Sequence, residues 1–219
     1  PAVVVNWAID FDKYRRIPLP GAFSSRYPAA AGKRLIVYLG RIAYSKGLDL
    51  LARAFGRVAQ THQDTYLVLV GPDHEGYGAK VQSVLSEEGV LERTIFTGMV
   101  PEQEKIEALW AAEVFVLPSY VEGFGIAMIE AMACERPVVI TRGSCMQHEV
   151  IQADAGLVVN CDVDELAQAL TRMLDDPELR KRMGQNGKNL VEDKFTWPRA
   201  AEEMLNVYED ILKCHNRKF

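Results

Sequence analysis

Short apolar runs, rich in β-branched residues, alternate along the chain with longer amphipathic segments. Glycine, proline and polar residues bound the apolar runs, which predicts buried strands. We expect these strands at residues 34–40, 65–71, 94–98, 114–118, 137–141 and 156–160. In the segments between them, apolar residues recur every three or four positions, which predicts helices. We expect these helices at 47–60, 79–89, 101–112, 125–134, 147–151, 163–175, 177–192 and 197–213.

This order of elements predicts an α/β fold. Continuously apolar strands separated by helices are typical of βαβ units, so we expect a Rossmann-like parallel sheet with helices on both faces. Residues 32–194 would form this domain, and residues 195–219 a C-terminal helix. Residues 1–31 contain a short strand-like apolar run at 2–7 and then a segment rich in proline, glycine and serine, which indicates a linker. In such sheets, ligands bind where the carboxyl ends of the strands meet helix N-termini.

Composition and charge narrow the classes of function. The chain has 219 residues, of which 48% are hydrophobic and 25% charged, as in ordinary globular proteins. Its formal net charge of −5 argues against a nucleic-acid partner, which normally requires a dominant basic face. The longest apolar runs are well short of the ~20 residues that a membrane span needs. The four cysteines have no zinc-ligand spacing, so we expect reduced thiols, no metal site and a cytoplasmic location.

Two cations follow the first expected strand. Arg41 comes directly after it, and Lys46 lies just before the next helix. Together with free helix N–H groups, they could bind an anion, although an arginine and a lysine in a loop are often only surface residues. Gly71 follows the second strand, where it would permit either a close backbone approach to a ligand or a turn.

The segment "EGFGIAMIE", from Glu122 to Glu130, follows the fourth strand. Gly123 and Gly125 keep side chains away from the start of a helix, so that its N–H groups could reach a phosphate or a sugar. The helical neighbours of Glu130 cannot pair with a carboxylate, and an unpaired buried carboxylate is costly. Glu130 must therefore meet donors from elsewhere or point into a cavity. The two hydroxyls of a ribose would satisfy it, as would backbone amides or serines.

These motifs resemble a known family. "GRIAYSKG", followed about 80 residues later by "EGFGIAMIEAMACERPVV", resembles the carboxyl-terminal domain of retaining glycosyltransferases of the GT-B architecture, typified by glycosyltransferase family four. The resemblance covers nearly the whole chain. "VVVNWAIDFDKY" is similar to the interdomain linker of that family, and "FTGMVP" to its base-contacting loop.

The resemblance implies a role for each matching position. Arg41 and Lys46 would hold the donor diphosphate, Glu122 would contact the transferred sugar, and Glu130 would accept the ribose hydroxyls. Arg41, Lys46 and Glu122 would be the catalytic residues. The donor-binding set implied in this way is Gly40, Arg41, Lys46, Gly71, Met99, Val100, Glu122, Gly123, Phe124, Gly125, Ile126 and Glu130, with Met99 and Val100 reading the base.

The reaction implied is transfer of a sugar, with retention, from a nucleotide-diphosphate sugar to an acceptor hydroxyl. Neither a cofactor nor a metal is expected. The acceptor, a glycan or lipid-linked sugar as in polysaccharide synthesis, would bind an amino-terminal domain outside these 219 residues. We therefore expect the isolated chain to be inactive, and we favour a domain cut from a longer enzyme over a partner half encoded as a separate chain.

Two other readings compete with a transferase. The first is a nucleotide-binding or regulatory module without catalytic activity. The second is a dehydrogenase-type dinucleotide domain, which the sequence disfavours because no G-x-G-x-x-G follows the first strand.

The sequence departs from the family pattern in two places. Glu135 replaces a glycine at a helix C-terminus, where a left-handed backbone is favoured. The loop "TRGSCMQHE" is poorer in glycine and proline than its counterpart in the family, so its geometry is open.

Overall fold

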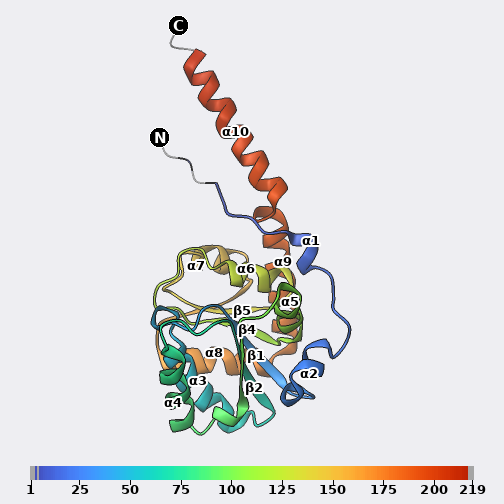
Figure 1. Ribbon diagram of the computed structural model, residues 1–219. Helices are drawn as coiled ribbons and strands as arrows, with labels where there is room; N and C mark the ends of the chain where they lie inside the picture. The colour runs from blue at the N-terminus through green and yellow to red at the C-terminus, as the bar shows by residue number, and fades with distance from the viewer. Residues whose placement is uncertain (1–2, 4, 217–219) are drawn as a thin grey trace.

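Six parallel strands form one sheet at the centre of the molecule (Figure 1). The computed structural model describes residues 3 and 5–216. The strands are β1 (Arg34–Leu39), β2 (Thr65–Val70), β3 (Thr94–Gly98), β4 (Val114–Leu117), β5 (Val138–Thr141) and β6 (Gly156–Val159). They pair in the order β3-β2-β1-β4-β5-β6, and each neighbouring pair is parallel. The expected strands and the Rossmann-like fold class are confirmed.

The continuous apolar character of the strands has a direct structural cause. Successive side chains of a strand point to opposite faces, and in β1 both sets are buried. Ile36 and Tyr38 enter the main core with α3, whereas Leu35 and Val37 enter a second cluster between the sheet and α2 and α5. Because helices cover both faces, the interior positions of β1, from Leu35 to Tyr38, do not favour a charged residue.

The expected helices are present, with ends that shift by up to three residues. They are α3 (Leu48–Thr61), α4 (Tyr77–Glu87), α5 (Glu102–Ala111), α6 (Ile126–Ala133), α7 (Gln147–Gln152), α8 (Val163–Asp175), α9 (Pro177–Lys194) and α10 (Trp197–Asn216). Single 3₁₀ turns lie at η1 (Pro28–Ala30), η2 (Tyr44–Lys46) and η3 (Leu91–Arg93). Pro101 occupies the N-cap position of α5. Glu102 and Glu104 lie in the first turn of this helix, where the helix dipole favours negative charge.

The strand-like run expected at residues 2–7 forms no strand at the residues that the structure describes. Ala2 and Val4 lie outside the described residues, and Val3, Val5, Asn6 and Trp7 form no strand. Val3 and Trp7 are largely exposed, so these apolar side chains do not enter the core. After it come two short helices, α1 (Phe11–Tyr14) and α2 (Ala22–Arg26), which pack against α6 and α5 respectively. The segment expected to be a linker is therefore partly docked on the domain.

Glu135 adopts the left-handed conformation expected at this helix end, with φ of 59°. Gly184 of α9 passes directly beneath it, because a Cβ there would lie 2.2 Å from the Glu135 carbonyl oxygen. The Glu135 carboxylate pairs with Lys188 of α9 at 2.6 Å. This turn lies at the far end of α6 from Glu122.

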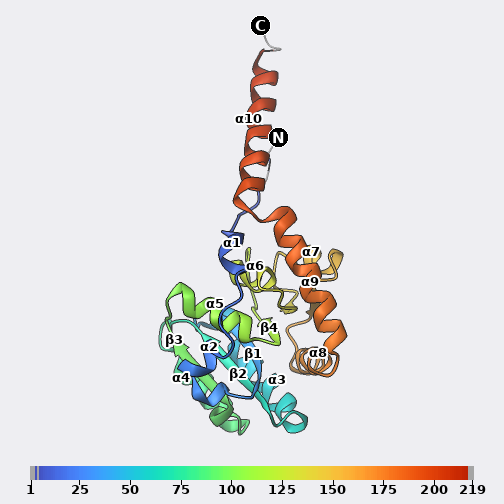
Figure 2. The ribbon, with the colours of Figure 1, turned by 90° about the vertical axis from the view of Figure 1, so that its right-hand side faces the viewer.

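The helix α10 extends away from the rest of the molecule in both views (Figures 1 and 2). Several of its apolar side chains are exposed: Trp197, Met204, Leu205, Tyr208, Ile211 and Leu212. Within the described residues, no helix combines the length and apolar character needed to cross a membrane.

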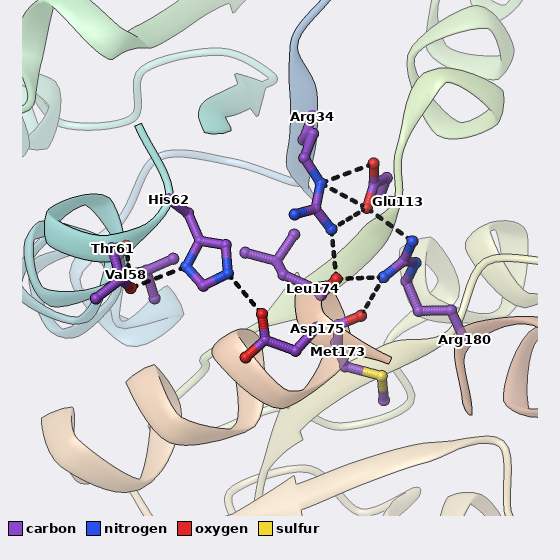
Figure 3. A network of polar contacts seen from close by, with 9 residues as sticks. All are labelled: Arg34, Val58, Thr61, His62, Glu113, Met173, Leu174, Asp175 and Arg180. Carbon is purple, nitrogen blue, oxygen red and sulfur yellow. Dashed lines mark hydrogen bonds and ion pairs between the residues drawn. The ribbon is translucent and has the colours of Figure 1, made fainter. Parts of the chain in front are cut away.

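A polar network fastens the amino ends of β1 and β4 to the C-terminus of α8 (Figure 3). The Arg34 guanidinium donates to Glu113 Oε2 at 2.8 Å and also to the Leu174 carbonyl oxygen. Arg180 pairs with the same Glu113 oxygen at 3.2 Å and donates to Leu174 O at 2.7 Å. Two arginines thus satisfy the terminal carbonyls of α8, as expected at the negative end of a helix.

The strand order reverses between β1 and β4. β1 continues towards β2 and β3 on one side, whereas β4 continues towards β5 and β6 on the other. In doubly wound sheets this switch point leaves a crevice outside the carboxyl ends of the two central strands. The loops that carry Lys46 and Glu122 leave the sheet at this crevice.

Candidate functional site

Lys46 and Glu122 meet at the switch point although they are 76 residues apart. Lys46 Nζ lies 2.7 Å from Glu122 Oε2, and both side chains are largely buried, with exposed fractions of 17% and 13%. Ser119 Oγ donates to the same carboxylate oxygen at 3.3 Å. The two charges therefore form a partly desolvated pair at the end of the sheet, where an anion would meet the lysine and a hydroxyl group the glutamate.

Gly47 explains how the two loops come so close. Its φ is 63°, in the left-handed region, and an added Cβ would lie 2.1 Å from the Pro118 carbonyl oxygen. The Tyr120 amide donates to Ser45 O at 3.0 Å, which ties the lysine loop to the glutamate loop. Only glycine allows this approach of one backbone to the other.

The loop after β5 completes the support of Glu122. The Glu122 amide donates to Gly143 O at 2.9 Å, and the Cys145 amide donates to Glu122 O at 3.0 Å. Thr141 Oγ1 donates to Ser119 O at 2.5 Å. The "TRGSCMQHE" loop, whose geometry the sequence left open, therefore fixes the backbone that carries the carboxylate.

Arg41 lies beside this pair with its side chain exposed. Its backbone carbonyl accepts a hydrogen bond from the Tyr38 hydroxyl at 2.7 Å. Burial raises the pKa of Tyr38, so this phenol remains a donor. In the part of the chain that the structure describes, the Arg41 guanidinium has no carboxylate partner, which leaves its planar fork available to an anion.

A cleft of about 210 Å³ lies between these loops. It is lined by Leu39, Gly40, Arg41, Lys46, Leu117, Glu122, Gly125, Ile126 and Ala127. Gly125 has φ of 69° and precedes the first turn of α6, whose amides have no partner within the helix. Two cations, one carboxylate and a helix N-terminus therefore face one small space. This donor set suits a phosphorylated ligand that also carries hydroxyl groups.

The other predicted positions, Gly71, Met99, Val100, Gly123 and Phe124, are not among the residues that line the cleft. Gly71 passes so close to the first loop that an added Cβ would be 2.0 Å from Gly40 O, so its close approach is to another backbone segment. Met99 and Val100 follow β3, which β2 separates from β1, and Met99 is 84% exposed. Phe124 packs edge-on against Phe195, whereas a Cβ on Gly123 would meet open space.

Glu130 is satisfied by side chains that the sequence did not indicate. Its Oε1 accepts a hydrogen bond from Tyr14 Oη at 2.6 Å and lies 2.7 Å from Lys105 Nζ. Of the protein groups considered from the sequence, neither backbone amides nor serines supply these contacts. Tyr14 belongs to α1 and Lys105 to α5, so three segments far apart in the sequence meet at this carboxylate.

Ser119, Tyr14, Lys105 and Gly47 are thus the site residues that sequence reasoning missed. Gly47 had one usable signal, since a glycine directly after a cation in a strand–helix loop permits close approach. Lys105 had none, because it stands in the acidic first half of an ordinary amphipathic helix. Among the described residues, no three His, Cys, Asp or Glu side chains are grouped as metal ligands would be.

A larger hollow, of about 710 Å³, lies at the opposite end of the strands, near the amino ends of β4 and β5. Its arginines already have partners: Arg180 binds Glu113 and the end of α8, and Arg136 donates to Cys134 O and Ala112 O. These charges secure helix ends and strand ends, so the smaller cleft at the switch point is the stronger candidate for a ligand site.

Comparison with known proteins decides the family. The sequence model of the family "Glycosyl transferases group 1" matches residues 22–190. The chain belongs to this family. The resemblance to GT-B glycosyltransferases of the family-four type is thereby confirmed.

Relatives of this group 1 glycosyl transferase agree in sequence and in fold. A GDP-mannose-dependent α-(1-6)-phosphatidylinositol monomannoside mannosyltransferase of Mycolicibacterium smegmatis is 31% identical over 197 residues, which cover 86% of this chain and 51% of that protein. A sucrose-phosphate synthase from Thermosynechococcus elongatus superposes with a TM-score of 0.80 at 28% identity, over 96% of this chain and 52% of that one. Anabaena HepE, solved with UDP-glucose, shares the fold with a TM-score of 0.79 at 19% identity, over 94% and 56% of the two chains.

This group 1 glycosyl transferase chain spans about half the length of the relatives it matches. The half that it represents contains the cleft at the switch point.

Proposed function

We propose that this domain binds the nucleotide-diphosphate sugar donor of a retaining glycosyltransferase. The observation that carries the proposal is the convergence of Arg41, the Lys46–Glu122 pair and the N-terminus of α6 on one cleft. In this arrangement the cations and the free helix amides face the donor diphosphate, while Glu122 faces the sugar that is transferred.

In the proposed reaction, the bond between the anomeric carbon and the diphosphate oxygen breaks, and a bond to the acceptor oxygen forms on the same face of the sugar. The acceptor hydroxyl gives its proton to the departing diphosphate oxygen, and the nucleoside diphosphate leaves with the electrons of the broken bond. Negative charge grows on the diphosphate as the anomeric carbon becomes cationic. Donors already in place there stabilise this transition state without reorganisation. Arg41 and Lys46 would do so without a metal ion.

The remaining predicted residues would hold the part of the donor that stays behind. Glu130 would accept ribose hydroxyls, and the backbone at Met99 and Val100 would contact the base. The names of similar proteins support a nucleotide-sugar donor without fixing its base, since the mycobacterial relative is GDP-mannose-dependent and the Anabaena structure contains UDP-glucose. The acceptor, a glycan or lipid-linked sugar, would bind in the half of the enzyme that lies outside this chain.

Replacing Arg41 with alanine should weaken the binding of a nucleoside diphosphate by about 10- to 100-fold, because a hydrogen bond to a charged group contributes roughly 1.5–3 kcal/mol. Affinity for the corresponding nucleoside should change less than about twofold, since it has no diphosphate to contact Arg41. Calorimetric titration of the chain with UDP, GDP and ADP and with their nucleosides measures both quantities. An equal loss for both kinds of ligand would remove Arg41 from its assigned role.

The same titration also tests the domain as a whole. If none of these nucleoside diphosphates binds, the cleft is not a donor site. If they bind but the complete enzyme transfers no sugar, the domain is the non-catalytic nucleotide-binding module considered as the alternative.

A further inference from the structure

The short helix α1 is docked at a fixed place beside Glu130. Tyr14, at its end, is only 4% exposed. The Tyr14 carbonyl oxygen accepts a hydrogen bond from Trp110 Nε1 at 2.8 Å and contacts Cys134 Sγ at 3.5 Å. Because Trp110 belongs to α5 and Cys134 ends α6, the segment ahead of the sheet is bound to both helices that flank the buried carboxylate.

Tyr14, Lys105 and Glu130 form a closed triangle of polar contacts. Tyr14 Oη lies 2.6 Å and Lys105 Nζ 2.7 Å from Glu130 Oε1, and the tyrosine and lysine are themselves 2.8 Å apart. The lysine ammonium also lies 5.2 Å from the centre of the Tyr14 ring. Burial, and then the negative charge of Glu130, raise the pKa of Tyr14, so the phenol stays protonated and donates to the carboxylate.

Both contacts use the same oxygen of Glu130. No donor among the residues that the structure describes is hydrogen-bonded to Oε2. This oxygen is also not one of the fully buried polar atoms that lack a hydrogen-bond partner. Ile126 lines the cleft, and Glu130 lies four residues further along α6, on the same side of the helix and about 6 Å away along its axis. The second oxygen therefore has no partner among the described residues, and it belongs to a side chain that is 10% exposed and lies about one helical turn from the cleft.

We propose that Tyr14 and Lys105 are positioning residues for donor recognition: they hold Glu130 through Oε1 so that Oε2 is presented to the ribose hydroxyls. This inference rests on the proposed function of the cleft. Lys105 compensates the charge of a carboxylate that burial would otherwise penalise, and Tyr14 fixes the direction of the free oxygen. Recognition of the ribose then depends on α1 being docked, so a segment outside the sheet becomes part of the donor site.

The test compares two ligands that differ only in the ribose. The 219-residue chain is titrated calorimetrically with the nucleoside diphosphate that it binds best among UDP, GDP and ADP, and with the 2′,3′-dideoxy form of that ligand. The wild type should prefer the ribose form. Lys105→Met should weaken binding of the ribose form about tenfold, the typical effect of leaving a buried polar group without its partner, and should change the dideoxy form less than about twofold. Tyr14→Phe should give a smaller loss of about threefold, again for the ribose form alone.

Two further variants separate positioning from general stability. Lys188→Met breaks a lysine–glutamate pair at the other end of α6, where Glu135 is 35% exposed against 10% for Glu130, and it should leave the ratio of the two affinities unchanged. Lys105→Arg keeps the charge and should retain most of the preference for ribose. If Lys105→Met does not fold, Tyr14→Phe carries the test, because it keeps the packed ring and removes only the hydroxyl.

The outcomes distinguish this inference from the function on which it rests. An equal loss for both ligands in Lys105→Met and Tyr14→Phe, or no loss in either variant, overturns the positioning role while donor binding stands. A wild type that binds both ligands equally shows that Glu130 does not contact the ribose, which also overturns it. A wild type that binds no nucleoside diphosphate removes the proposed function, and the positioning role with it.

Discussion

Replacing Lys46 with methionine should lower kcat for sugar transfer by about 100- to 1,000-fold in the complete enzyme, assayed with the donor identified by titration. This is the loss typical of removing one preorganised donor to developing negative charge. Lys46 Nζ lies in a partly desolvated site, where water screens its charge less than at the surface. Methionine is similar in length and apolar, so it removes the charge with little change in packing. Glu122, left without its cation, would also repel the departing diphosphate.

The split between kcat and KM shows how Lys46 acts. If its charge mainly stabilises the leaving group, kcat falls much more than KM rises, because the interaction is stronger in the transition state than with bound donor. Lys46→Arg should recover part of the rate, since it restores a charge whose geometry differs. Lys188→Met serves as a control, because that pair lies at the far end of α6. A raised KM with unchanged kcat would show instead that Lys46 binds donor and transition state equally.

The fold could be predicted from the sequence because each element carries its own local signal. Strands buried on both faces must be apolar throughout, and β1 shows this with Ile36 and Tyr38 on one face and Leu35 and Val37 on the other. The run at residues 2–7 carries the same signal, but its described residues, 3 and 5–7, form no strand, since pairing requires a free sheet edge beside it. Composition alone cannot report whether such an edge is available.

The centre of the cleft could also be anticipated. Arg41, Lys46 and Glu122 each follow a strand, and the carboxyl ends of parallel strands lie at one edge of the sheet. Their positions directly after strands therefore predict, from the sequence alone, that they lie close together. Strand order then decides which loops are neighbours: β1 and β4 are adjacent, whereas β3 lies beyond β2.

The partners of Glu130 could not be anticipated in this way. Tyr14 lies 116 residues before it in a short helix of the expected linker, and Lys105 lies 25 residues before it on another helix. Neither residue occupies a position that a strand–loop rule singles out. That a buried glutamate needed donors followed from elementary electrostatics, but which side chains supply them depends on how α1 and α5 dock.

Replacing Gly47 with alanine should lower the free energy of unfolding of the chain by about 2–5 kcal/mol, through two separate effects. The first is backbone strain, because a left-handed conformation costs a residue with a Cβ about 1–2 kcal/mol. The second is a clash of the new Cβ with the Pro118 carbonyl oxygen. Neither backbone segment can move aside freely, so relief should cost about 1–3 kcal/mol more, as in overpacked cores.

Gly32→Ala is the matched control for this substitution, because it isolates the first effect. Gly32 has nearly the same φ, 68°, but an added Cβ there meets nothing within 4 Å. The free energy of unfolding of Gly32→Ala should therefore fall only by the roughly 1–2 kcal/mol that backbone strain costs. Urea unfolding of both variants measures the difference, which is the cost of separating the lysine loop from the end of β4. Equal losses in the two variants would mean that the loops can part without penalty. In that case the 2.7 Å pair between Lys46 and Glu122 would not depend on the backbone contact at Gly47.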